Sequence, residues 1–70
     1  MQTLLFNTAT KTAKLYEGHQ EKSQILYDLT DIPTVKAESN YYEVFRTSED
    51  GKARPVLRLP ISNTIMVLVH

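Results

Sequence analysis

The sequence contains no cysteine, and this absence limits how so small a chain can be stabilised. Neither a disulfide nor a thiolate metal site can form. Seventy residues make one domain, residues 1–70, because either half alone would lack a core. One core of this size usually supplies only a few kcal/mol. Self-association is the most economical remaining source of stability, so we expect a homo-oligomer, most simply a dimer.

The sequence also lacks an excess of charge and a long apolar run. Eight basic and eight acidic residues cancel, so no long-range field draws the protein toward nucleic acid or a membrane surface. Residues 1–7 contain no basic segment, and their apolar run is too short for a signal peptide or a membrane span. We therefore expect a cytoplasmic protein that does not contact membranes.

No motif of high specificity for catalysis, metals or cofactors is present. The serines have no glycine elbow around them, and the two histidines offer few candidates for a general base. Glu17, His19 and Glu21 alternate and could share one side of an extended segment, but a structural site usually needs four ligands. We expect no enzymatic activity, no cofactor and no bound metal.

The first half of the chain predicts a hairpin and then a helix. An apolar run at Leu4, Leu5 and Phe6 precedes small polar residues at 7–11, which favour a turn. The apolar residues on both faces of this first strand suit a central position in a sheet. In residues 20–29 the spacing of the apolar positions favours a helix over a strand at 23–29, and Pro33 ends it. The positions that carry this spacing are Ile25, Leu26, Leu29 and Ile32.

The second half predicts a β-meander. Residues 34–37 are a short strand or a connector, and residues 41–47 are aromatic and β-branched, which is typical of a strand. Glu49-Asp50-Gly51 fits a hairpin turn with glycine in the left-handed position, and Pro55 indicates an edge strand or a bulge. Together these elements predict an α+β fold: a small antiparallel sheet of four to five strands, with the helix packed on one face.

The hairpin of residues 41–59 is the best candidate for a binding surface. A three-residue loop would set Arg46 opposite Arg54 and Tyr42 opposite Arg58, whereas a two- or four-residue loop would expose Tyr41 and Phe45 instead. Either loop length is expected to leave the basic residues of the returning strand on one polar face. The candidate residues for binding a partner or an anion are Tyr42, Arg46, Lys52, Arg54 and Arg58.

These residues fit several surfaces. They could form an ordinary solvated face with arginines paired to Glu43 or Glu49, a protein interface rich in arginine and tyrosine, or a site for nucleic acid or a nucleotide. Our leading hypothesis is a non-enzymatic accessory or inhibitor-type protein that binds a macromolecular partner through the hairpin. Small viral or mobile-element proteins that block a host factor fit this description. The alternatives are a nucleic-acid or anionic small-ligand binder and a structural assembly subunit.

The last strand, residues 64–69, is uncharged and apolar on both sides. Such a strand promotes aggregation when it lies at an open sheet edge, so we expect it in the centre of the sheet or paired across a dimer axis. In the second case the residues of the oligomer interface are Ile65, Val67 and Val69.

Overall fold

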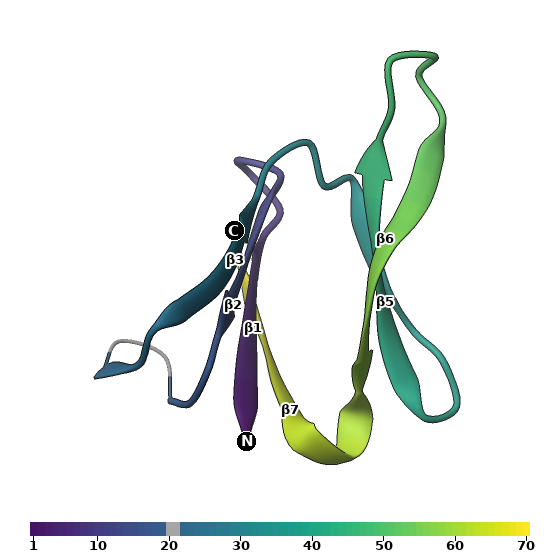
Figure 1. Ribbon diagram of the computed structural model, residues 1–70. Helices are drawn as coiled ribbons and strands as arrows, with labels where there is room; N and C mark the ends of the chain where they lie inside the picture. The colour runs from purple at the N-terminus through teal and green to yellow at the C-terminus, as the bar shows by residue number, and fades with distance from the viewer. Residues whose placement is uncertain (20–21) are drawn as a thin grey trace.

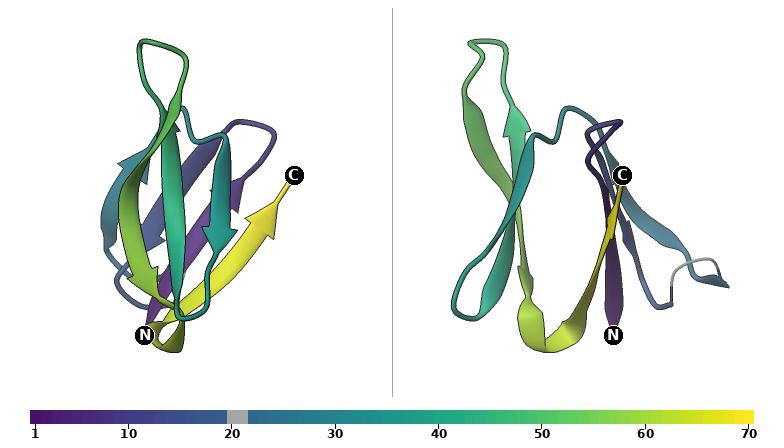
Figure 2. Two further views of the ribbon diagram at one scale, coloured as in Figure 1. Left: turned by 90° about the vertical axis from the view of Figure 1, so that its right-hand side faces the viewer. Right: turned by 180° about the vertical axis from the view of Figure 1, so that it is seen from behind.

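The computed structural model describes residues 1–19 and 22–70, and these residues form two facing β-sheets (Figure 1). The first sheet has four strands in the order β3-β2-β1-β7, and the second has three in the order β4-β5-β6. The strands are β1 (Gln2–Asn7), β2 (Thr12–Tyr16), β3 (Ile25–Leu29), β4 (Thr34–Ala37), β5 (Tyr41–Thr47), β6 (Ala53–Pro60) and β7 (Thr64–Val69). The 3-10 helix η2 (Ile61–Asn63) carries the chain from β6 in the second sheet to β7 in the first (Figure 2).

The N-terminal hairpin is confirmed. Strands β1 and β2 pair antiparallel, with Leu4 opposite Leu15 and Phe6 opposite Ala13. The carboxamide oxygen of Asn7 accepts hydrogen bonds from the N–H groups of Ala9 and Thr10, at 3.0 and 3.1 Å, which holds the turn. As expected, β1 is a central strand, because it lies between β2 and β7.

The predicted helix at residues 20–29 is wrong, and so is the α+β fold class. Its first two residues, Gln20 and Glu21, lie outside the described residues, and the rest of the segment contains strand β3. With 60% of the chain in strands and 6% helical, the fold is nearly all sheet. No helix in the described residues is long and apolar enough to cross a membrane.

The helix prediction is wrong because the apolar residues on which it was based do not share a buried face. Ile25 and Leu26 are 45% and 41% exposed on an edge strand, whereas Ile32 is fully buried in the connection to β4. The backbone reverses at Asp31, whose φ of 58° is left-handed, and the next N–H, that of Ile32, donates to the carbonyl of Lys11 at 2.9 Å. Ile25 and Tyr27 instead pair with residues of β2. Their side chains, one β-branched and one aromatic, favour a β-strand.

Side chains from both sheets and from the connection before β4 meet in one small core. The buried apolar residues are Leu4, Phe6, Ala13, Leu15, Ile32, Val44 and Leu59. Four partly buried residues pack against them: Leu29, Val35, Leu57 and Met66. This core fits the expectation for a chain of this length.

The C-terminal strand β7 lies at a sheet edge, so its expected central position is wrong. It pairs parallel to β1, with Leu4 opposite Met66, and has no second neighbour in the sheet among residues 1–19 and 22–70. The parallel pairing is possible because η2 and the second sheet return the chain to the start of β1. An uncharged edge therefore stands open on the molecule.

Candidate functional site

The hairpin of β5 and β6 extends beyond the rest of the two sheets (Figure 1). Of the loop lengths considered, the structure has the three-residue one, since Thr47 pairs with Ala53, and the N–H of Ser48 donates to the carbonyl of Lys52 at 2.9 Å. Gly51 has a φ of 81°, the left-handed conformation that favours glycine. We call residues 48–52 together with Arg54 the hairpin tip.

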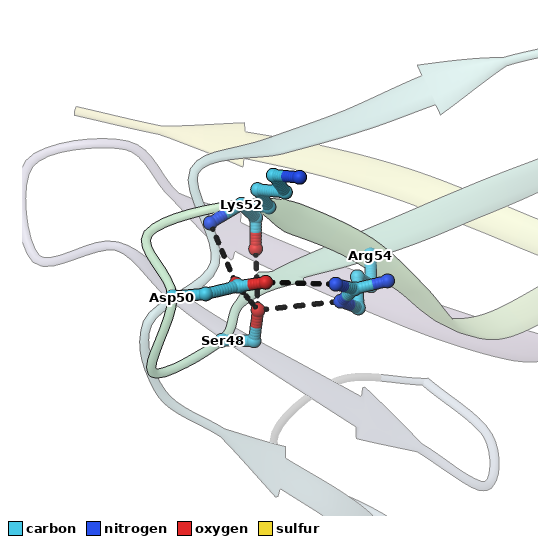
Figure 3. A network of polar contacts seen from close by, with 4 residues as sticks. All are labelled: Ser48, Asp50, Lys52 and Arg54. Carbon is cyan, nitrogen blue, oxygen red and sulfur yellow. Dashed lines mark hydrogen bonds and ion pairs between the residues drawn. The ribbon is translucent and has the colours of Figure 1, made fainter.

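A network of polar contacts around Asp50 fixes the hairpin tip (Figure 3). One carboxylate oxygen of Asp50 accepts from the hydroxyl of Ser48 and, at 3.1 Å, from the N–H of Lys52. The other accepts from Nη2 of Arg54 at 2.8 Å. The Ser48 hydroxyl, the Arg54 guanidinium and the Lys52 N–H, in that order of effect, lower the pKa of Asp50. The tip is thus a pre-formed structure held by local bonds.

A second cluster lies on the outer face of the three-stranded sheet. Lys36, Glu43 and Arg58 stand side by side on β4, β5 and β6. Arg58 Nε donates to Glu43 Oε2 at 2.6 Å, and this bond raises the pKa of Arg58. Glu43 is only 8% exposed, so its charge is held beneath the arginine. Because a buried carboxylate is costly unless it is paired, the arginine has a structural role here.

Two aromatic rings flank this ion pair. The guanidinium of Arg58 lies over the ring of Tyr41, and the ammonium of Lys36 lies over the ring of Phe45, each 5.0 Å from the ring centre. Both rings are half-buried. We call Lys36, Tyr41, Glu43, Phe45 and Arg58 the outer-face cluster; it combines apolar surface with charges that are compensated within the protein.

The structure does not bring the five predicted site residues together. Lys52 and Arg54 are in the hairpin tip, whereas Arg58 is in the outer-face cluster. Arg46 is half-buried and donates from Nε to the carbonyl of Thr30 at 3.2 Å, and Tyr42 is half-buried opposite Leu59. The expected pairing of Arg46 with Arg54 is present, but that of Tyr42 with Arg58 is not.

A β-bulge causes this separation. Phe45 pairs with Pro55 and Val44 with Leu57, so Val56 is an extra residue on β6. The extra residue reverses the alternation of faces beyond it, and Arg58 therefore points away from the side that Arg54 occupies. The expectation that Lys52, Arg54 and Arg58 share one polar face is wrong. Pro55 was the signal for the bulge.

Lys36 and Glu43 belong to the outer-face cluster but were not among the predicted site residues. Tyr41, Glu43 and Phe45 alternate along β5 and so lie on one face of it, which the sequence alone is enough to predict. Lys36 could not be found in the same way, because its position opposite Glu43 depends on how β4 pairs.

Within the ranges 1–19 and 22–70 there is no group of three or more metal-ligating side chains and no pocket. Of the alternating residues considered as ligands, Glu21 lies outside these ranges. Comparisons with protein-family models, with curated proteins and with solved structures found no match. The hairpin tip and the outer-face cluster are therefore the two candidate binding surfaces.

Proposed function

We propose that this protein is a small, non-enzymatic binding protein of the accessory or inhibitor type that engages another protein through the β5–β6 hairpin. We also propose that the protein acts in the cytoplasm. The outer-face cluster is the observation that carries it. Tyrosine, phenylalanine and arginine are enriched at protein interfaces, and here they lie together on one sheet face.

The arrangement of the cluster favours binding because its side chains are already held in place before a partner docks. The two stacked cations and the ion pair already restrict the side chains of Lys36, Arg58 and Glu43. A partner that docks on them loses less side-chain entropy than it would on mobile residues. The hairpin tip, with Glu49 and Lys52 exposed beside the fixed Asp50–Arg54 pair, would add charges of both signs at the rim.

A protein partner fits these charges better than a phosphate does. Each arginine on the hairpin's exposed surfaces is paired with a carboxylate: Arg54 with Asp50 and Arg58 with Glu43. A nucleotide or nucleic acid would have to compete with those carboxylates, and the neutral net charge supplies no wider attraction. Binding to nucleic acid is therefore the weaker alternative.

The test uses two double variants with matched changes. In the first, the hairpin variant, Lys36→Glu and Val56→Glu alter the outer-face cluster and the neighbouring strand β6; in the second, Lys22→Glu and Ile25→Glu alter exposed residues on or before β3. Val56 and Ile25 are 46% and 45% exposed, so the matched changes meet similar surroundings. Each protein is tagged and used to capture partners from its source cell, and urea unfolding checks that both variants are folded.

We expect the hairpin variant to lose at least about tenfold in affinity for the captured partner, which corresponds to about 1.4 kcal/mol, because the few residues that anchor an interface contribute about 2 kcal/mol or more each. The β3 variant should recover the same partner as the parent protein. Equal recovery by all three proteins would contradict the proposal. Steeply salt-dependent binding of a single-stranded oligonucleotide, lost in the hairpin variant, would favour the alternative.

A further inference from the structure

We propose that strand β7 pairs antiparallel with β7 of a second copy, so that two four-stranded sheets join into one continuous sheet in a symmetric dimer. This surface is separate from the hairpin, and the inference does not depend on the proposed partner. It rests on three observations: how the sheet edges are protected, where the free backbone groups point, and how the sequence of β7 matches itself.

The two sheets in the described part of the chain have four edges, and three of these carry features that discourage pairing with another chain. Strand β3 contains Asp28 and faces an irregular pairing on β2, and β4 is only four residues long and contains Lys36. Strand β6 contains a bulge, prolines and arginines. Charges, prolines, bulges and short length are the usual protections of an edge strand. Strand β7, TIMVLV, has six residues and none of these protections.

The free edge of β7 presents backbone groups that are ready to bond. The carbonyl of Val69 accepts from the N–H of Thr8 at 2.8 Å, so Val69 directs its backbone groups toward β1. Because alternate residues of a strand direct these groups to opposite sides, Met66 and Leu68 direct theirs to the open edge. Unpaired backbone groups favour the addition of a further strand.

The sequence of β7 is complementary to itself when the two-fold axis passes beside Met66. Met66 then exchanges both backbone bonds with Met66 of the second copy, and the N–H of Leu68 donates to the carbonyl of Thr64 across the axis. Ile65 faces Val67 on the outer side, a pair of β-branched residues that stabilises antiparallel strands. No charge is brought near another. A strand from a different protein would need to match this edge by chance, whereas a second copy matches it by symmetry.

The pairing would also cover apolar side chains. Leu68 is 56% exposed and Ile65 is 38% exposed on the edge strand. On the outer face, Val67 lies beside Leu5 and Ile65 beside Thr3. In the dimer, this apolar surface continues across the axis into that of the second copy, and a chain with so small a core gains further burial.

Sedimentation velocity between 1 and about 100 μM tests the dimer, in a range where an interface of this type associates. The test variant is Leu68→Lys, which places a charge at the edge. The control is Leu26→Lys, the same change on β3, at a residue 41% exposed. We expect the parent protein and the control to approach twice the mass of the chain as concentration rises, and Leu68→Lys to remain at the mass of one chain.

Hydrogen exchange on the parent protein decides the matter if Leu68→Lys does not fold. The amides of Met66 and Leu68 should become protected as concentration rises, while those of β3 do not change. A parent protein that is monomeric throughout the range would overturn the proposal. A dimer with unprotected Met66 and Leu68 amides, or one abolished by Leu26→Lys and retained by Leu68→Lys, would also overturn it.

Discussion

Two buried threonines on the same sheet provide a test of how hydrogen bonding stabilises this protein. Thr3 and Thr64 are 3% and 6% exposed. The hydroxyl of Thr3 donates to the carbonyl of Gly18 at 2.7 Å, whereas the hydroxyl of Thr64 has no hydrogen-bond partner among the described residues. Replacing each with valine removes a hydroxyl at nearly constant shape. We predict that the two substitutions change stability in opposite directions.

The magnitudes follow from the cost of burying a polar group. An unbonded buried hydroxyl costs about 1–3 kcal/mol, so Thr64→Val should stabilise the fold by about 1 kcal/mol. Thr3→Val removes a bond and leaves the Gly18 carbonyl without that donor, so it should destabilise the fold by about 1–2 kcal/mol. For a domain of this length, 1 kcal/mol corresponds to a change in melting temperature of about 4–8 °C.

Thermal and urea unfolding, followed by circular dichroism, measure both effects. All three proteins are compared at one concentration, because association of the native state would raise apparent stability. Thr64→Val should melt above the parent protein and Thr3→Val below it. If Thr64→Val is destabilised as much as Thr3→Val, the Thr64 hydroxyl makes a bond that stabilises the native state, and the argument fails.

Two further predictions concern the hairpin tip. Gly51→Ala meets no steric contact, because no atom of the described residues lies within 4 Å of the added methyl group, but the φ of 81° is unfavourable for alanine. The variant should lose about 1 kcal/mol in urea unfolding, and an unchanged or raised stability would show that the turn relaxes freely. Carboxyl NMR should give Asp50 a pKa below the ordinary value of 3.8, and Arg54→Ala should raise it. Since the folded-state pKa is lowered, the stabilisation by Asp50 is present at neutral pH and is lost as pH falls through that pKa. A parent value at or above 3.8 would rule out the network.

The sequence predicted the elements that local turn chemistry determines. Asn7 and the small residues after it specified the first hairpin, and Gly51 specified the position of the second turn, although its loop length stayed open between three residues and two or four. The segment around Ile25 could not be assigned in the same way. The spacing of its apolar residues suits a helix, but the segment forms a strand because it pairs with β2. The spacing also does not reveal which of these residues are buried.

The candidate site was predicted in part for similar reasons. Pro55 indicated a bulge or an edge, and β6 has both, but the consequence for Arg58 required knowing that Val56 is the extra residue. Glu43 was considered as a partner of arginines on a solvated face, whereas it is buried on the outer side of the sheet beneath Arg58. The edge position of β7 depends on its parallel pairing with β1, which no local pattern encodes.

The pairing of β1 with β7 has a consequence for how the chain folds. It joins Gln2 to Thr64, so β1 cannot complete its backbone hydrogen bonds until β7 has been synthesised. Until then β1 can pair only with β2. The backbone groups along its other edge remain unpaired, and another strand or a chaperone can bind them. Contacts between such distant residues also slow folding, because a long loop must be closed before they form. Strand β1 is therefore synthesised well before its partner β7, and its second edge is paired only after β7 has followed.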